Sequence, residues 1–98
     1  MWYAAIEFDI LLGAVGSRKA KRSAVRPIIA EIRRRFEVSV AEVGHLDLHR
    51  RALIGVVVTA ADSARVTQVL NDVERHVAWL PEIDLLSARR HVHHIEDD

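Results

Sequence analysis

One segment constrains the fold of this chain more than any other, the stretch Ser17–Phe36, which reads SRKAKRSAVRPIIAEIRRRF. Its apolar residues recur at intervals of three and four, which is the spacing of an amphipathic helix that packs one side on a core. These apolar residues are Val25, Ile28, Ile29, Ile32 and Phe36. The chain has 98 residues, so we expect one domain with a single core of its own.

The other side of this predicted helix is basic. Eight of the 14 Lys and Arg residues fall between Arg18 and Arg35, where Glu31 is the only acid. The formal net charge of the whole chain is 0, so only this uneven distribution favours an anionic partner. Cations spaced along one flank can contact successive phosphates, although an ordinary solvated basic face remains the alternative. The predicted nucleic-acid-binding residues are Lys19, Lys21, Arg22, Arg26, Arg33 and Arg34.

Pro27 lies inside the same helical pattern. A proline there removes a backbone hydrogen bond and clashes with the carbonyl of the residue four positions earlier, at a cost of about 3 kcal/mol. The sequence therefore predicts a kink or a break between Ser23 and Arg26.

The remaining patterns complete a fold prediction. Residues 2–12 alternate between apolar and other side chains, as in a half-buried strand. Further strands are expected at 37–43, 52–60 and 83–92, with a second helix from its Asp62 cap to Pro81 and Trp79 packed at its end. This order predicts an α+β, ferredoxin-like βαββαβ fold, a four-stranded antiparallel sheet with two helices on one face. The domain is expected to span residues 1–95, before a frayed acidic tail at 96–98.

Two helices on one face leave the other face of the sheet uncovered. Leu53, Gly55 and Val57 fall on that face of the third strand, beside Tyr3 and Ala5 of the first. An apolar patch of this kind usually has a partner, and we expect a homodimer through the sheet or its edge. The alternative function is therefore a homodimeric structural or regulatory protein that binds a protein partner or a small molecule on the open sheet face.

Three smaller clusters are candidates for chemistry. His91 and His93 alternate on the last strand close to His94, and His45, Asp47 and His49 alternate in the connection before the third strand. Two imidazoles on the last strand need a third ligand, and nothing in the sequence indicates that the two clusters meet, so we expect no metal and no cofactor.

Glu7 and Asp9 share the uncovered face, where their like charges are expected to raise one pKa. No nucleophile, base and orienting group occur at a recognisable spacing, so we expect no catalytic residue and no enzyme.

The location follows from what the sequence lacks. The chain has no cysteine, which is compatible with a reducing cytoplasm. No apolar stretch approaches the roughly 18 residues of a membrane-spanning helix. The sequence predicts a cytoplasmic protein with no membrane association.

Two segments carry a resemblance to a known family. They are SRKAKR at residues 17–22 and RRRFEVSVAEVGHLDLHRRALIGVVV at residues 33–58. They resemble motifs of the YlxP-like family of small bacterial proteins of unknown function, which commonly read SLKEKR and RFNVSVAEVDHQDLWQRA. The agreeing positions are Ser17, Lys19, Lys21, Arg22, Phe36, Val38, Ser39, Val40, Ala41, Glu42, Val43, His45, Asp47, Leu48, Arg51 and Ala52. Arg18, Ala20, Gly44 and His49 depart from the motifs, the last where an aromatic residue is usual.

The resemblance implies both a fold and a setting. The fold of the family is ferredoxin-like, in agreement with the pattern above, and its genes often lie among those for transcription and translation factors. The resemblance therefore implies a role near RNA or the ribosome. We expect a noncatalytic RNA- or ribosome-associated binding protein whose basic helix contacts phosphates and does not read bases.

Overall fold

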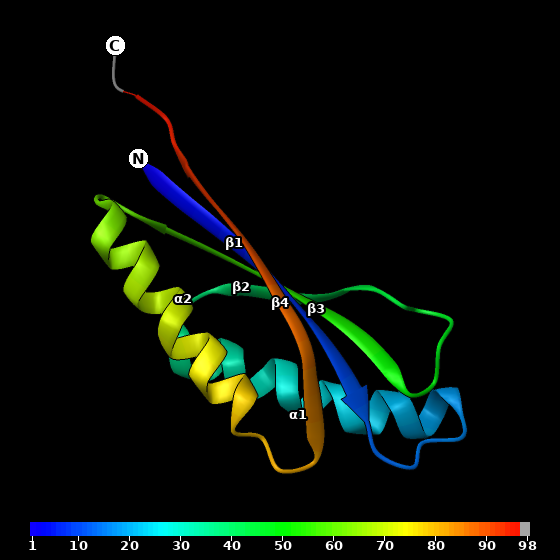
Figure 1. The fold of residues 1–98 in the computed structure, drawn as a ribbon. Helices are drawn as coiled ribbons and strands as arrows, with labels where there is room; N and C mark the ends of the chain where they lie inside the picture. The colour runs from blue at the N-terminus through cyan, green and yellow to red at the C-terminus, as the bar shows by residue number, and fades with distance from the viewer. Residues whose placement is uncertain (97–98) are drawn as a thin grey trace.

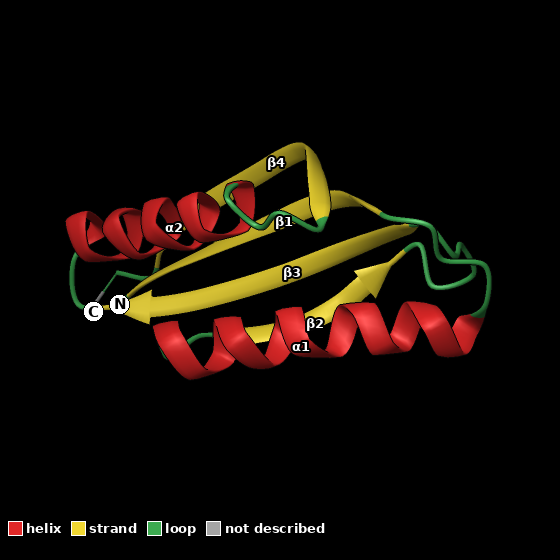
Figure 2. Ribbon diagram, turned by 90° about the horizontal axis from the view of Figure 1, so that it is seen from below, coloured by secondary structure: helices red, strands yellow, loops and turns green. Residues whose placement is uncertain are grey.

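The structure, a computed structural model, describes residues 1–96 as one sheet with two helices on one of its faces (Figure 1, Figure 2). The elements are β1 Trp2–Leu12, α1 Arg18–Phe36, β2 Ser39–Gly44, β3 Arg51–Ala60, α2 Ser63–Ala78 and β4 Ile83–His94. This is the α+β, ferredoxin-like βαββαβ fold that the sequence predicts. Of the expected acidic tail, Glu96 follows β4, and residues 97–98 lie outside the described residues.

The sheet has the order β2-β3-β1-β4, and every neighbouring pair is antiparallel. The predicted alternation of β1 is confirmed, because every second side chain from Ala4 to Leu12 is buried against the helices. The strands β2 and β4 form the two edges, and the face away from the helices stays open (Figure 2). The core between the layers includes Ile6, Phe8, Ile10, Ile32, Ile54, Val56, Val66, Leu70, Val73 and Val77.

Both helices begin at a capping side chain. The Ser17 hydroxyl accepts a hydrogen bond from the Ala20 N–H at 3.1 Å, and the Asp62 carboxylate accepts one from the Arg65 N–H at 2.8 Å. The helix α1 ends at Glu37, whose φ of 49° is left-handed and turns the chain away. For this reason β2 begins at Ser39 and not at residue 37 as the sequence suggested.

Of the kink or break predicted between Ser23 and Arg26, the break is wrong, because α1 runs without interruption from Arg18 to Phe36 (Figure 2). Ser23 and Pro27 are both exposed, so the carbonyl that loses its intrahelical partner lies on the solvent side of the helix. On the opposite side Val25 and Ile28 are buried in the core. This packing holds the helix across the proline, and the two ends of the basic flank belong to one rigid element.

The expected packing of Trp79 is also wrong. Its side chain is 81% exposed, the largest value among the large apolar side chains of residues 1–96. The buried stripe of α2 runs through Val69, Val73 and Val77, and Trp79 falls off this stripe just after the helix ends.

Candidate nucleic-acid interface

The helix α1 presents most of the predicted basic residues to solvent. Lys19, Arg22 and Arg26 are exposed, as are Arg33 and Arg34 nearer the C-terminal end. Within residues 1–96, the side chains of Lys19, Arg22 and Arg26 form no hydrogen bond or ion pair. These three cations are therefore not neutralised by the fold itself.

Arg33 and Arg34, nearer the C-terminal end of α1, each have a contact within the protein. The Arg33 Nη2 donates to the carbonyl of Val40 at 3.0 Å, which ties the helix to the edge strand β2. The Arg34 Nη2 lies 3.2 Å from the Glu31 carboxylate, one turn away on the exposed face of α1. Exposed pairs of this spacing contribute only a few tenths of a kcal/mol, so Arg34 remains available to another anion.

A groove of about 380 Å³ runs between α1 and the connection that follows β2. Arg18, Arg22 and Arg26 lie one helical turn apart, within about 80° of one another around the axis, and line one wall of the groove. Its remaining lining includes Val25, Ile29, Glu42, Leu46 and Asp47. The Arg18 Nη2 lies 3.7 Å from Asp47, and both side chains are almost fully exposed. The groove thus combines three cations with an apolar floor and two acids at its far wall.

Lys21 does not belong to the exposed set, although the sequence placed it there. It is 5% exposed, and its Nζ donates to the carbonyl of His45 at 2.7 Å and lies 2.8 Å from Glu42 Oε2. The contact with Glu42 is an ion pair without hydrogen-bond alignment, because that oxygen has no hydrogen-bond partner within residues 1–96. Lys21 also lines the groove, but its ammonium group is already engaged by the His45 carbonyl and the Glu42 carboxylate. Lys21 therefore holds the connection after β2 against α1.

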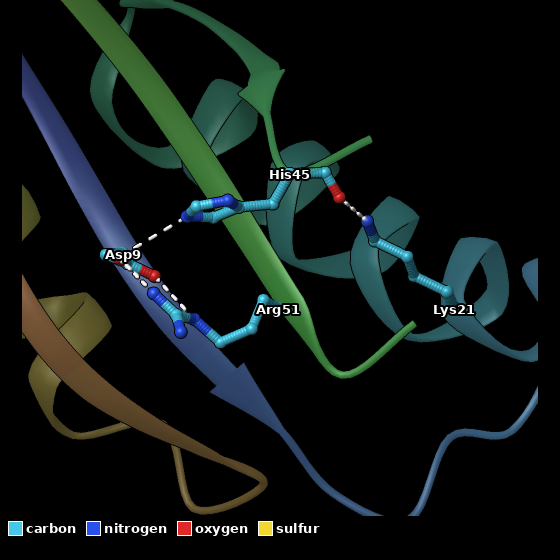
Figure 3. A network of polar contacts seen from close by, with 4 residues as sticks. All are labelled: Asp9, Lys21, His45 and Arg51. Carbon is cyan, nitrogen blue, oxygen red and sulfur yellow. Dashed lines mark hydrogen bonds and ion pairs between the residues drawn. The ribbon is translucent and has the colours of Figure 1, made fainter. Parts of the chain in front are cut away.

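The same connection is tied to the open face of the sheet through His45 (Figure 3). His45 has a left-handed φ of 56°, uncommon for residues other than glycine, and its ring Nε2 lies 3.4 Å from the Asp9 carboxylate. The Arg51 guanidinium donates to both oxygens of Asp9, through Nε at 2.9 Å and through Nη2. The polar contacts of Lys21, His45, Arg51 and Asp9 thereby connect α1, the connection, β3 and β1.

This arrangement corrects the expectation for the acidic pair. The hydrogen bonds from Arg51, and then those from His45, hold the pKa of Asp9 below its ordinary value, against the effect of partial burial. Glu7 lies opposite Arg89 of β4 and opposite Gly55 of β3. Asp9 is therefore an ionised partner of Arg51, and its pKa is not the one that the like charges of the pair raise.

The two histidine clusters lie apart. His93 stacks on Tyr3 with ring centroids 5.1 Å apart, and on His91 at 5.9 Å, at the open face near one end of β1. His45 contacts Asp9, six residues along β1 and so roughly 20 Å away. Within residues 1–96, no group of three or more His, Asp or Glu side chains is placed to hold a metal ion.

The open sheet face carries a hollow of about 320 Å³ between β1, β2 and β3, with β4 at its margin. Its apolar lining comes from Ala5, Val43 and Val57, and the last two side chains are about half exposed. The Val43 side chain lies directly over Gly55, where an added Cβ would come within 2.9 Å of it. Glu7, Arg89 and His91 form the charged side of the hollow.

A further hollow, of about 610 Å³, lies where α1 and α2 both end, and sequence reasoning missed it. Trp79, Arg75 and Arg35 line it beside His76, whose ring meets Phe36 edge-on at 5.5 Å. Burial, and then the charge of Arg35, lower the pKa of His76. One signal was present in the sequence, since Trp79 falls outside the apolar spacing of the second helix.

The protein is thus a ferredoxin-like α+β domain in which α1, one of the two helices that cover the sheet, carries exposed cations. A crystal structure of SnoaB, a cofactor-independent oxygenase from Streptomyces nogalater, is similar with a TM-score of 0.50 and 13% identity. The match covers 98% of this chain and 95% of that one, and it supports the fold alone.

The chain belongs to the family described as Protein of unknown function (DUF503), which matches residues 4–90. It is also 26% identical over 78 residues to the Uncharacterized protein YlxP of Bacillus subtilis (strain 168), covering 80% of this chain and 85% of that protein. The resemblance to a YlxP-like family of unknown function is therefore confirmed. In the described part of the chain, no helix is long and apolar enough to cross a membrane.

Proposed function

We propose that this protein is a noncatalytic RNA- or ribosome-associated binding protein that contacts phosphates through α1. The observation that carries the proposal is the set of exposed cations without an internal partner, Lys19, Arg22 and Arg26. Arg33 and Arg34 extend the contact toward the C-terminal end of the helix, and Arg18 adds to it at the groove. Lys21, which the sequence included, is left out because it is buried.

The geometry suits a polyanion better than a single small anion. Residues one turn apart on a helix rise by roughly 6 Å, so side chains as long as arginine can contact successive phosphates. The positions Arg18–Arg34 span roughly 24 Å of one continuous helix, since Pro27 does not break it. Such contacts fix the position of a nucleic acid strand but carry no sequence information of their own.

The proposal is tested by titrating the protein against structured ribosomal RNA at two salt concentrations. Phosphate binding should weaken steeply as salt rises, because counterions are released on binding. The double variant Arg22→Glu, Arg26→Glu should abolish binding and leave the circular dichroism spectrum unchanged. Arg65→Glu, Arg89→Glu is the matched control, since it changes the charge equally at exposed residues outside the groove. Unchanged affinity in the first variant would refute the proposal.

A second candidate function, a homodimeric structural or regulatory protein, is favoured by the hollow on the open sheet face. Val57 is 43% exposed there among apolar neighbours, and apolar association depends little on salt. Under this candidate the protein sediments as a dimer, Val57→Asp converts it to a monomer, and salt does not. A monomer at all concentrations would turn attention to a different protein partner or a small molecule.

A further inference from the structure

The most unusual apolar side chain of this protein is Trp79, at the hollow where α1 and α2 end. Its indole is 81% exposed, and within residues 1–96 no aromatic ring or cation stacks on it. Trp2, the other tryptophan, stacks on His94 with ring centroids 4.3 Å apart and is half-buried. The ring faces of Trp79 are therefore free to stack on a planar partner.

We propose that Trp79 stacks on an unpaired base of single-stranded RNA, while Arg75 and Arg35 contact the adjoining phosphates. This inference rests on the proposed function and assigns to it a preference for unpaired RNA. Proteins that bind single strands combine such an aromatic platform with a positively charged track for the backbone. Here the platform is the indole of Trp79, and the positive charges beside it are Arg75 and Arg35, with Arg34 next along the exposed face of α1.

The charges around Trp79 favour an anionic partner. Arg75 lies 3.4 Å from Asp72, and both side chains remain in contact with water. The Arg35 Nη1 lies 3.1 Å from His76 Nδ1 and 3.8 Å from the carboxylate of Glu31. The Arg35 guanidinium also lies over the Phe36 ring, 5.5 Å from its centroid. The ion pairs with Asp72 and Glu31 are exposed and weak, so the positive charges of Arg75 and Arg35 are not neutralised by them.

A protein partner fits this surface less well. Trp and Arg are common hot-spot residues of protein interfaces, but such hot spots lie in well-packed pockets that lose all contact with water and are ringed by further contacts. The hollow at Trp79 is instead lined by Arg35, Asp72 and Arg75, with Phe36 and Leu80 only partly exposed. One flat aromatic ring among charged groups matches a nucleotide, which offers a flat base and a phosphate.

The hollow lies on the other side of α1 from the groove. At roughly 100° per residue, Arg35 is about 100–180° around the axis from Arg18, Arg22 and Arg26, with the exposed Arg34 between them on the solvent side. A strand that contacts both the groove and Trp79 therefore crosses the exposed face of α1 past Arg34.

The test compares two fluorescein-labelled probes, a ten-nucleotide oligouridine and a ten-base-pair RNA duplex, at low salt. The single strand should bind more tightly and quench tryptophan emission. Trp79→Leu should weaken its binding by about 5- to 20-fold, remove the quenching and leave duplex binding unchanged. Trp79→Phe, which keeps an aromatic ring, should retain most of the affinity. Because the side chain is exposed, both variants should melt at the same temperature as the parent protein.

The outcomes separate this inference from the function on which it rests. If Trp79→Leu binds the single strand within twofold of the parent while Arg22→Glu, Arg26→Glu does not, stacking is overturned and RNA binding stands. Trp79 would then be assigned to a protein contact. An equal loss for strand and duplex would also overturn stacking. If the parent binds neither probe at low salt, the proposed function and this inference both fail.

Discussion

Replacing Lys21 by methionine should destabilise the protein strongly, although the sequence pattern assigned this residue to phosphate binding. Its ammonium group lies 2.8 Å from the Glu42 carboxylate and donates to the His45 carbonyl at 2.7 Å. Methionine keeps the apolar stem, so the loss is confined to the charge and its hydrogen bond. The substitution leaves Glu42 without its cation and the carbonyl of His45 without this donor.

The expected loss follows from these contacts. Removing one partner of a buried ion pair costs about 3–5 kcal/mol, but the Glu42 side chain is still 23% exposed and water partly compensates it. An unsatisfied carbonyl adds about 1 kcal/mol. We expect a net decrease of about 2–3 kcal/mol in the free energy of unfolding. For a domain of this size that corresponds to a Tm lower by roughly 10–20 °C.

The assay is urea and thermal unfolding followed by circular dichroism, with RNA binding measured below the Tm. Arg22→Met, one residue along on the exposed flank, is the control and should change stability by no more than about 0.5 kcal/mol. Adding Glu42→Leu to Lys21→Met removes the unpaired charge and should recover at least half of the loss. A stability within about 0.5 kcal/mol of the parent, together with lost RNA binding, would refute the structural role of Lys21.

Three further outcomes are expected. Pro27→Ala should raise the free energy of unfolding by about 1–3 kcal/mol, because it restores the hydrogen bond from residue 27 to the Ser23 carbonyl in a continuous helix. A lower Tm would contradict this expectation. His76 binds a proton more readily in the unfolded chain than in the folded protein, because folding lowers its pKa. The free energy of unfolding should therefore fall as the pH drops below the ordinary pKa of 6.5. In urea titrations between about pH 5 and 7, His76→Gln should flatten this dependence. Gly55→Ala should lower the free energy of unfolding by about 1–2 kcal/mol, because the added methyl group meets the Val43 side chain. Adding Val43→Ala should relieve this loss, and an unchanged melting curve for Gly55→Ala alone would refute the reasoning.

Patterns that depend on neighbouring residues were predictable from the sequence. The alternation of β1, the stripe of α2 and its Asp62 cap are each set within a few residues, and all three are confirmed. Pro27 shows the limit of such local reasoning. Its penalty is real, but the burial of Ile28 and Ile32 and the exposure of the affected carbonyl outweigh it.

The environment of Lys21 depends on contacts that the helical pattern does not contain. That pattern places Lys21 beside the apolar stripe at one end of the helix, where a long side chain normally reaches water. Whether it does is decided by Glu42 and His45, which are more than 20 residues away and are brought over the helix by the pairing of β2 with β3. The hollow at Trp79 depends likewise on where the fold places Arg35, which is still farther from Trp79 in the sequence.

The two segments that resemble the family motifs meet at one place in the structure, and this separates two kinds of residue within them. Lys21 of the first segment contacts Glu42 and His45 of the second, so these three identities are explained by folding. Arg22 also matches the motif, yet it is exposed and forms no hydrogen bond or ion pair within residues 1–96. Folding therefore does not account for Arg22, which is a residue that the proposed RNA binding uses. Opposite effects are expected at these adjacent positions, since Lys21→Met should lower stability and leave RNA affinity unchanged, whereas Arg22→Met should leave stability unchanged and weaken RNA binding.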